Sequence, residues 1–495
     1  MNELILLIPI FLPLAAGIAA AFLPALKRDR ALYPFVTVVL LVNAAAVIAL
    51  ACLPETRLTI LGAGTKFAIA FQTDGIARLF SVISSLAWLI TAVYSYRYME
   101  HEDAHPRFYA FYLIVIGLIN ALDYSATLIT MYLCYEFMTL CSLPLVLHSL
   151  TKEAISAGLK YLFYSIAGAM MALFGFFCMY AYANTLDFTP GGVMDSALLA
   201  GHEPLFLAGV FAVLIGLCTK AGMFPMHAWL PTAHPIAPAP ASAQLSAVIT
   251  KAGVLCLIRT VFFIAGADRI AGTWVQYTWI ILTLITIFMG SMMAYRERGI
   301  KKRLAYSTVS QVSYALLGLA LLTPEAIVGS LLHVVFHMAA KSALFLCAGS
   351  IIFETGKTRT DELRGLGISM PVTFWCWTLA ALTLIGIPPT SAFLSKWYLA
   401  TAALSFAGTA ASGLPAVISW LAPVILLVSA LLTAGYLLPV TVSGFFPGRE
   451  FDRTKVTRLD QKRGLTIPVC VFTAAAVLLG IYAEPLIRFL TQISL

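Results

Sequence analysis

The chain has 495 residues, of which 61% are hydrophobic and 11% are charged, with a mean hydropathy of +0.92 and a formal net charge of +8. Because soluble proteins carry about 25% charged residues, this composition excludes a soluble fold and indicates a membrane protein. The basic balance does not indicate a nucleic-acid partner, because the lysines and arginines lie in short loops without interleaved aromatic residues.

Apolar stretches of about 20 residues, the length that crosses a bilayer, recur along the whole chain with short loops between them. They predict an all-α polytopic membrane protein with about 14 transmembrane helices. At the N-terminus an acidic residue precedes the apolar run and basic residues follow it, which is the reverse of a secretory signal peptide. The expected helices cover residues 4–24, 31–53, 74–98, 107–122, 124–147, 157–184, 205–230, 236–265, 273–295, 304–322, 326–353, 371–407, 417–444 and 464–492.

Lysine and arginine residues gather in alternate loops. One set of loops holds twenty of them, whereas the opposite set holds three, Arg57, Lys66 and Arg269. Because cytoplasmic loops carry the excess of Lys and Arg, we expect a bacterial or archaeal cytoplasmic membrane protein with both termini outside. The twenty are Lys27, Arg28, Arg30, Arg97, Arg107, Lys152, Arg296, Arg298, Lys301, Lys302, Arg303, Lys357, Arg359, Arg364, Arg449, Arg453, Lys455, Arg458, Lys462 and Arg463.

Proline interrupts two of the expected helices, one around Phe224-Pro225 and one from Gly386 to Pro389. These breaks stand at corresponding places in two blocks of five expected helices. Because five is odd, the second block should run opposite to the first, as in transporters built from inverted repeats with broken helices near the bilayer midplane. The predicted divisions are residues 1–106 with helices 1–3, 107–265 and 273–444 for the two repeats, and 445–495 with a cytoplasmic loop and helix 14.

The first block carries three ionisable residues inside apolar segments. Glu136 lies near the middle of its helix, Lys220 comes just before the first break, and Lys251 lies in mid-span. A charge at the bilayer centre costs about 2.5–3.5 kcal/mol on insertion scales, so such residues are usually paired, neutralised or functional. Burial and an approaching carboxylate change the proton affinity of a lysine in opposite directions. A pair of Glu136 and Lys220 would therefore load or release a proton, and the alternative is static structural charges.

The second block carries titratable residues on one helix face. His333, His337 and Lys341 follow one another at intervals of four, which places them on the same side of a helix. Histidine titrates near neutral pH, so this face is expected to relay protons, although a lone histidine in a membrane is more often a satisfied core residue. Lys396 follows the second break, at a place comparable to Lys220, and is the expected terminal proton carrier.

Weaker candidates surround these residues. The helix over 304–322 carries Tyr306, Ser310 and Gln311, which would either hold ordered water between the lysines or join neighbouring helices by hydrogen bonds. His227 and His234 flank the first break. Basic residues near helix ends are better explained by snorkelling to the interface, and Asp74 by helix capping. The snorkelling candidates are Arg78, Lys160, Arg259 and Arg488.

Cysteine usage indicates no metal or redox centre. All nine cysteines lie in apolar segments and none forms a Cys-x-x-Cys pair, so we expect no disulfide and no zinc or iron–sulfur site. They are Cys52, Cys134, Cys141, Cys178, Cys218, Cys256, Cys347, Cys376 and Cys470.

Four segments resemble the proton-translocating antiporter-like subunits shared by respiratory complex I, membrane-bound hydrogenases and Mrp cation/proton antiporters. They are KAGMFPMHAWLPTAHPIAPAPASAQLSAVITKAG, KKRLAYSTVSQVSYALLGL, HVVFHMAAKSALFLCAGSI and GIPPTSAFLSKW. The resemblance covers expected helices 3 to 13. It implies that Glu136 and Lys220 form the pair of the first half-channel and Lys251 the connector. It also implies a central relay and an exit group, formed by His333, His337 and Lys341 and by Lys396 respectively.

Among family members, the chain looks most like the Mrp D-type subunit and its equivalents in membrane-bound hydrogenases, or the N- and M-type subunits of complex I. It ends after the last expected helix, without the long lateral helix of the L-type subunit. Lys396 stands where the M-type carries glutamate, which argues against that subtype. The resemblance implies partner membrane subunits, and no flavin, haem, quinone or iron–sulfur cofactor in this chain.

These residues predict two linked half-channels. Protons would enter from the cytoplasm near the first break, pass along the lysines and histidines, and leave outside through the second half-channel. Three assemblies remain open: a secondary cation/proton antiporter, the pump of a complex I-like NADH:quinone oxidoreductase or energy-converting hydrogenase, and the membrane partner of a proton-coupled inorganic carbon uptake system. Whether sodium ions also move through the complex stays open.

Overall fold

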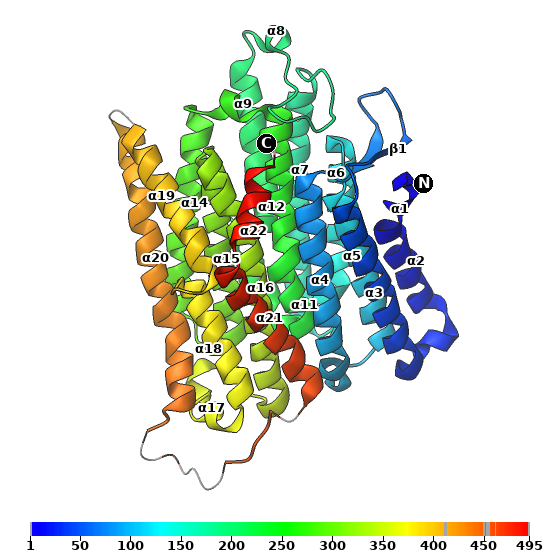
Figure 1. Ribbon diagram of the computed structural model, residues 1–495, viewed down its shortest axis with the longest axis vertical. Helices are drawn as coiled ribbons and strands as arrows, with labels where there is room; N and C mark the ends of the chain where they lie inside the picture. The colour runs from blue at the N-terminus through cyan, green and yellow to red at the C-terminus, as the bar shows by residue number, and fades with distance from the viewer. Residues whose placement is uncertain (1, 410–412, 449–450, 452–455, 461, 494–495) are drawn as a thin grey trace.

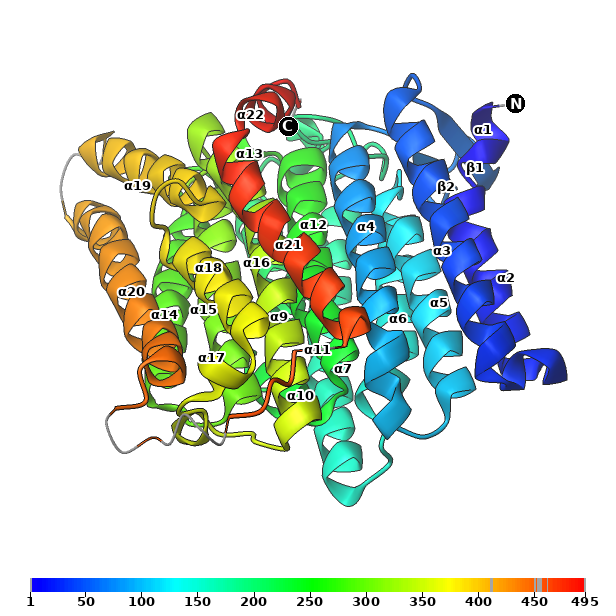
Figure 2. The same ribbon diagram turned by 60° about the horizontal axis from the view of Figure 1, so that its bottom comes forward.

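The computed structural model describes residues 2–409, 413–448, 451, 456–460 and 462–493. Within these residues the chain is a bundle of long helices with one small β-hairpin (Figures 1 and 2). Twelve helices in this described part are long and apolar enough to cross a membrane, judged by length and composition. The expected all-α polytopic membrane fold is therefore confirmed.

The N-terminal part forms three long helices, with the hairpin between the second and the third. The two strands run antiparallel, with Arg57 opposite Gln72. Asp74 caps the third long helix, as expected, because its Oδ1 accepts a hydrogen bond from the Ala77 backbone N–H at 2.9 Å. The elements are α1 (Asn2–Ile5), α2 (Ile8–Phe22), η1 (Pro24–Lys27), α3 (Asp29–Cys52), β1 (Arg57–Leu61), β2 (Ile69–Gln72), α4 (Gly75–Tyr98) and η2 (Met99–His101).

The first expected repeat contains five membrane-length segments, of which the last is one continuous helix over residues 239–265 with two π-helical turns. A π-helical turn is rare and often marks a functional site. The elements are α5 (His105–Asp123), α6 (Leu128–Val146), α7 (Lys152–Tyr180), α8 (Ser196–Leu199), α9 (Glu203–Ala221), α10 (Leu230–Ile236), α11 (Ala239–Gln244), η3 (Leu245–Ile249), α12 (Thr250–Ile258), η4 (Arg259–Ala265) and α13 (Ala267–Ile270).

The second expected repeat and the C-terminal part follow. The longest helices of this part, α16 and α20, run 32 residues each. The elements are α14 (Trp274–Arg296), α15 (Ile300–Ala320), α16 (Pro324–Thr355), η5 (Thr360–Glu362), α17 (Leu366–Ser369), α18 (Pro371–Ile385), α19 (Ser391–Thr409), α20 (Leu414–Phe445), α21 (Arg463–Ile481) and α22 (Glu484–Thr491).

Both expected helix breaks are present, and both follow a glycine in the left-handed region. Gly222 ends α9 with φ +81°, and Gly386 ends α18 with φ +90°. Glycine is favoured there because it has no Cβ to clash with the backbone. The chain then continues as α10 after the first break and as α19 after the second. The matching breaks agree with a repeated architecture, and the inverted relation of the two blocks stays a prediction.

The number of membrane crossings also stays a prediction. The expected helix over 304–322 is present as α15, but its serines, tyrosines and glutamine make it less apolar than the twelve. The expected helix over 371–407 is divided by the second break into α18, which is shorter than a full span, and α19.

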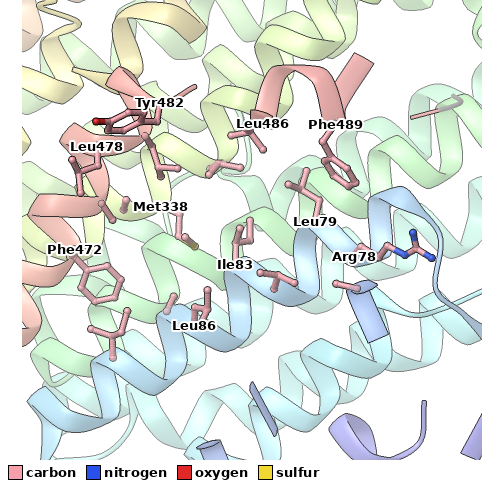
Figure 3. Close-up of a pocket in the computed structure, with 18 residues that line it drawn as sticks. Arg78, Leu79, Ile83, Leu86, Met338, Phe472, Leu478, Tyr482, Leu486 and Phe489 are labelled. Atoms are coloured by element: carbon pink, nitrogen blue, oxygen red, sulfur yellow. The ribbon is translucent and has the colours of Figure 1, made fainter. Parts of the chain in front are cut away.

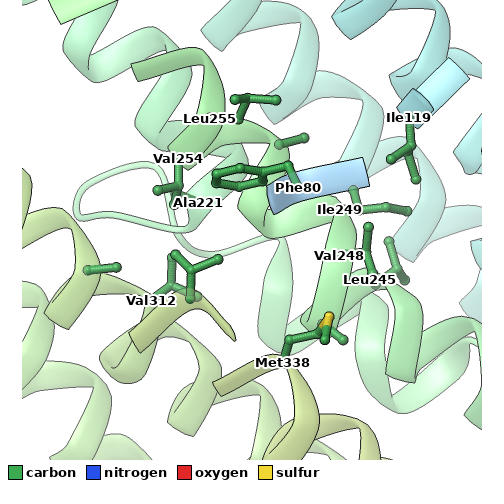
Figure 4. Close-up of a cluster of buried hydrophobic side chains, with 14 of the residues drawn as sticks. Phe80, Ile119, Ala221, Leu245, Val248, Ile249, Val254, Leu255, Val312 and Met338 are labelled. Atoms are coloured by element: carbon green, nitrogen blue, oxygen red, sulfur yellow. The ribbon is translucent and has the colours of Figure 1, made fainter. Parts of the chain in front are cut away.

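The centre of the bundle lies where the two blocks meet. The most apolar windows of α16 and of the helix over 239–265 are completely buried, whereas those of α20 and α21 are one-third buried and lie at the periphery. Figure 4 shows apolar side chains from α4, α5, α9, α12, α15 and α16 meeting between them. Among those labelled are Phe80, Ile119, Ala221, Leu255, Val312 and Met338. The site residues of α12 and α16 are thus shielded from lipid by other helices.

The two chain ends lie at the same end of the bundle, together with the hairpin of β1 and β2 (Figure 1). The loop that joins α6 to α7 lies at the opposite end, as do the end of α20 and the start of α21 (Figure 2). Most of the predicted cytoplasmic basic residues belong to loops of that opposite end. Arg449, Arg453 and Lys455, which also belong to this set, lie outside the described residues.

Candidate functional site

Lys220 lies in the last turn of α9 and is buried, with 1% of its surface exposed. Its Nζ donates hydrogen bonds to Tyr161 Oη at 2.9 Å and to Ser165 Oγ at 3.3 Å, both on α7. The same ammonium lies 4.6 Å from the centre of the Tyr161 ring and 5.7 Å from that of Tyr135. Aromatic faces attract cations, so hydroxyls and rings together hold this charge.

Glu136 does not form the expected direct pair with Lys220. Both residues lie in the described part of the chain, and no ion pair joins them; the Glu136 Oε1 is buried without a hydrogen-bond partner. The lysine turns instead to the hydroxyls of α7, which satisfy its donors without a carboxylate. Glu136 lies on α6, half-buried, one residue after the Tyr135 whose ring faces Lys220. A pair between them requires a movement of one of the two side chains.

Lys251 connects the two expected repeats. Its Nζ donates to the Ser246 carbonyl oxygen at 2.5 Å and is hydrogen-bonded to His337 Nδ1 of α16 at 2.6 Å. Ser246 belongs to the π-helical turn η3, and its carbonyl oxygen also accepts a hydrogen bond from the Thr250 hydroxyl at 2.8 Å. A proton on Lys251 is therefore within one hydrogen bond of the second block.

The two histidines of α16 continue this line. Their rings stack with centres 5.9 Å apart. His333 Nδ1 is hydrogen-bonded to Ser395 Oγ of α19 at 2.9 Å, and its ring stacks on Tyr314 of α15. Within the described residues the Nε2 atoms of His333 and His337 have no hydrogen-bond partner although both are buried. Each ring thus has one nitrogen in a hydrogen bond and one without a partner in the described part of the chain.

Lys341 does not continue the line as the spacing suggested. Its Nζ donates to the Leu304 carbonyl oxygen of α15 at 2.9 Å. The expected order ran from the two histidines to Lys341, whereas His337 contacts Lys251. Intervals of four place side chains on one helix face, but each then meets a different neighbouring helix. Lys341 is therefore a side branch near the centre rather than the next member of the chain of contacts.

Lys396 occupies the second break. Its Nζ donates to the Leu384 and Ile385 carbonyl oxygens, at 2.5 and 3.1 Å, which end α18. A cation is favourable at a helix C-terminus, where carbonyl groups lack partners. The ammonium also lies 5.0 Å from the centre of the Tyr314 ring, which stacks on His333. The structure thus brings Lys396 and His333 to one side chain, Tyr314.

The polar residues of α15 make helix–helix contacts. Ser310 Oγ lies 2.8 Å from Ser291 Oγ of α14 and 3.3 Å from Ser429 Oγ of α20. Gln311 donates to Thr433 of α20 at 3.4 Å. Tyr306 is half-buried. For Ser310 and Gln311 these contacts match the role of joining helices.

The remaining weak candidates differ in burial. His234 is fully buried with both ring nitrogens unpartnered within the described residues, and its ring stacks on Phe345. His227 is half-buried beside Phe224 of the first break. Lys160 of α7 is half-buried, as a snorkelling side chain would be. None of the three makes a contact with the line of Lys251 and the two histidines that the described residues show.

Arg259 was expected to snorkel, and this expectation is wrong. It is fully buried, and its guanidinium donates to both carboxylate oxygens of Asp74, at 2.5 and 2.8 Å. Phe188 and Phe263 lie against it. The chain separates the partners by 185 residues, so only the tertiary structure brings them together.

Asp123 is a buried acid that the sequence interpretation missed. It ends α5, is 2% exposed, and has an oxygen without a hydrogen-bond partner within the described residues. The signal was the same as for Glu136, because Asp123 lies inside a long apolar stretch, FYLIVIGLINALDYSATLITMY. Its position between two expected helices made it look like a loop residue.

Comparison with known proteins shows which solved structures and relatives this chain is similar to. A solved structure of the Mrp complex from Dietzia sp. DQ12-45-1b matches the fold with a TM-score of 0.84 and 21% identity, covering 100% of this chain and 97% of that one. The N-type subunit of the NADH-quinone oxidoreductase of Desulforudis audaxviator is 30% identical over 514 residues, covering 99% of this chain and 98% of the relative. The D-type subunit of the Na(+)/H(+) antiporter of Alkalihalophilus pseudofirmus is 26% identical over 446 residues, covering 89% and 86%.

The sequence profile of the family described as "NADH:quinone oxidoreductase/Mrp antiporter, TM" matches residues 125–422, which is more than half of the chain and contains the line of buried lysines and histidines. The chain belongs to this family of membrane subunits.

Proposed function

We propose that this chain translocates protons as one membrane subunit of a multisubunit complex. The observation that carries the proposal is the hydrogen bond between Lys251 and His337 at 2.6 Å, which joins the first block to the second. Both groups are titratable, and both are buried. A scaffold protein would gain nothing from two such groups at the point where its halves meet, because each imposes a desolvation cost.

From Lys251 to His333, the proposed pathway uses side chains already in contact. A proton enters from the cytoplasm near the first break, reaches Lys220, and passes to Lys251. It then moves to His337 and His333, and through Ser395 or across Tyr314 to Lys396 and the outside. Because like charges close together in a low dielectric cannot all persist, a proton arriving at one group favours release from the next.

Glu136 supplies the coupling in this proposal. When its carboxylate approaches Lys220, it stabilises the protonated lysine. In the present structure Lys220 is held by Tyr161 and Ser165 and Glu136 is apart, which corresponds to the uncoupled arrangement. A neighbouring subunit that moves Glu136 would therefore load or unload the first group of the line.

The parent complex is proposed to be a secondary cation/proton antiporter, with the chain in the role of the Mrp D-type subunit. This rests on the likeness to the D-type subunit of an antiporter over most of both chains. The second candidate is the proton pump of a complex I-like oxidoreductase, which is favoured by the nearly full-length likeness to an N-type subunit. In either case other membrane subunits are the partners.

The experiment is proton flux through the complex reconstituted in vesicles, with Lys251→Met as the variant. Methionine keeps most of the length of the lysine stem but cannot hold a proton. We expect flux to be abolished while every copurifying subunit is retained. Lys152→Met, which changes an exposed lysine at the start of α7, serves as the control and should keep wild-type flux. An assembled Lys251→Met complex with wild-type flux would refute the pathway.

Copurifying chains separate the two parent complexes. Iron–sulfur or nickel–iron subunits in the purified complex would make the chain part of a redox pump. Small apolar chains alone would make it part of an antiporter.

A further inference from the structure

Two adjoining cavities lie away from the line of lysines. The first is an apolar groove of 610 Å³ between α4, α16, α21 and α22 (Figure 3). The second is a polar pocket of 440 Å³ lined by Glu55, Gln72, Asp74 and Gln492 among others. Arg78 and Phe489 line both cavities, so the groove and the pocket meet at these two side chains. Together they form one amphipathic space with an apolar stem and a polar head.

Arg78 lies where the groove and the pocket meet. Its Nη2 donates to the Leu53 carbonyl oxygen at 2.7 Å, while its Nε is buried without a hydrogen-bond partner within the described residues. Figure 3 shows the guanidinium turned away from the apolar side chains of the groove. The Arg78 guanidinium lines both cavities and forms no ion pair within the described residues, and a guanidinium favours an anionic acceptor.

The polar pocket also carries an unused negative charge. Asp74 is neutralised by Arg259, but Glu55 is exposed and takes part in no ion pair that the described residues form. One free cation at the junction and one free anion in the pocket match a ligand with a phosphate next to an ammonium group.

We propose that the groove and the pocket bind one phospholipid with an amine in its headgroup. An acyl chain fills the groove, the phosphate accepts hydrogen bonds from Arg78, and the ammonium lies near Glu55. A guanidinium is suited to phosphate recognition because its donors form a rigid fork. The proposal rests on the fold alone and does not depend on the proposed proton pathway.

The short helix α22 supports a site at the membrane interface. It turns across the end of the bundle after α21 (Figure 2). Its exposed Arg488 and Glu484 form an ion pair at 2.8 Å, while Leu486 and Phe489 line the groove. Charged residues on one side and apolar residues on the other are typical of a helix that lies in the headgroup region. A polar pocket beneath such a helix is at the depth of lipid headgroups.

The lipid would seal the proton pathway on this side. Val335, Met338 and Ala339 of α16 line the groove, and they flank His337, which turns toward Lys251. The helix α16 thus separates the groove from the central contact. An acyl chain in the groove would keep water away from this helix on the bilayer side.

The test is to count the lipids that stay bound to the native complex after extensive detergent washing, by native mass spectrometry. Arg78→Gln removes the phosphate donor, and Ala475→Trp fills the groove from α21. We expect one phospholipid per chain in the wild type, mainly phosphatidylethanolamine. Retention should be about tenfold lower in Arg78→Gln, since one charge-assisted hydrogen bond contributes that much. It should be about tenfold lower in Ala475→Trp as well, because the indole takes the place of the acyl chain. Arg269→Gln and the lipid-facing Val424→Trp are the controls outside both cavities, and both should retain the lipid.

Glu55→Gln tests the headgroup separately. It should keep a bound phospholipid but abolish the preference for phosphatidylethanolamine over phosphatidylglycerol in competition. Equal retention in wild type, variants and controls would overturn the site. A polypeptide crosslinked to the groove in place of lipid would overturn it as well, and retention of phosphatidylglycerol in the wild type would overturn the headgroup assignment.

Discussion

Lys220, Lys251 and Lys396 all donate to uncharged acceptors: hydroxyls, backbone carbonyls and an imidazole. Removing one partner of a buried ion pair costs about 3–5 kcal/mol, because an unpaired charge is left behind. A hydrogen bond from a charged group to an uncharged acceptor contributes only about 1.5–3 kcal/mol. A proton can therefore leave such a lysine without stranding a buried carboxylate. The absence of a carboxylate partner within the described residues suits the proton-carrier role proposed for these lysines.

The pair of Asp74 and Arg259 has the opposite property. Arg259 is fully buried and both of its terminal nitrogens depend on one carboxylate. Asp74→Ala should destabilise the protein by about 3–5 kcal/mol, because it strands the guanidinium and also removes the cap of α4. Thermal unfolding of the purified complex measures this. Asp361→Ala, which breaks the exposed pair with Arg359, is the control and should leave the unfolding temperature nearly unchanged, because solvent screens exposed ion pairs. Similar losses for both variants would contradict the assignment.

His148 gives the protein a pH-dependent stability. It lies in the loop after α6, is 3% exposed, and burial together with the nearby Arg107 lowers its pKa to about 4. In the unfolded chain a histidine has a pKa of about 6.5 and binds the proton first as pH falls. Stability is therefore lost progressively between pH 6.5 and 4, by about 2 kcal/mol on going from pH 7 to 5.

The measurement is the unfolding temperature of the complex at pH 7 and pH 5. His148→Phe keeps the aromatic contact with Phe108 but cannot be protonated, so it should lose less stability at pH 5 than the wild type. An identical pH dependence in wild type and variant would show that His148 is protonated in the folded protein at little cost.

At the scale of elements, the close approach of α7 and α9 positions Lys220 against Tyr161 and Ser165. Glycines make this approach possible: a Cβ on Gly216 would lie 2.4 Å from the Gly168 carbonyl oxygen and 2.6 Å from the Ala172 backbone nitrogen. Small residues allow helix backbones to approach closely in membranes. Backbone atoms, unlike the end of a side chain, cannot move aside.

Gly216→Ala should therefore push the two helices apart and cost about 1–3 kcal/mol. The same shift would lengthen the hydrogen bonds of Lys220, so proton flux should fall together with thermal stability. Gly408→Ala, where no atom lies within 4 Å of the added Cβ, should leave both unchanged. A stable Gly216→Ala complex with normal flux would mean that the helices do not need this contact.

The sequence predicts elements better than it predicts partners. Hydropathy placed the helices near their observed ranges, because a membrane span must be long and apolar. Proline and glycine predicted the breaks around Phe224-Pro225 and from Gly386 to Pro389, and the helices end beside them at Gly222 and Gly386. The intervals of His333, His337 and Lys341 predicted a shared helix face, but not that they meet α19, α12 and α15 respectively. Which neighbour a face meets depends on how helices far apart in the chain pack, and periodicity carries no information about that.

For the same reason, the sequence does not show which partners the charged residues near helix ends have. The sequence shows only that Arg259 is near the end of its expected helix, and this position alone suggests snorkelling. Its partner Asp74 is on a different helix, at the start of α4. Asp123 looks like a loop residue from the sequence because it lies between two expected helices, whereas in the structure it ends α5.

At the scale of the whole molecule, the proposed pathway runs from one block to the other rather than straight through either. The first break lies in the first block and the second break in the second, and the only contact between titratable groups of the line that joins the blocks, within the described residues, is that of Lys251 and His337. The proposed pathway therefore predicts that access at the two breaks is on opposite sides of the membrane. The orientation of the chain in the membrane decides which side is the entrance.

The distribution of basic residues predicts that both termini and the β-hairpin are outside, and that the loop between α6 and α7 is cytoplasmic. Two exposed hydroxyl residues mark these ends: Thr65 in the hairpin turn and Ser149 in the loop. In a background with the exposed Cys52 and Cys470 replaced by alanine, a membrane-impermeant maleimide should label Thr65→Cys in intact spheroplasts. Ser149→Cys should be labelled only after the membrane is permeabilised, and both should react in denaturant. The reverse pattern would invert the orientation, and protons entering at the first break would then come from outside.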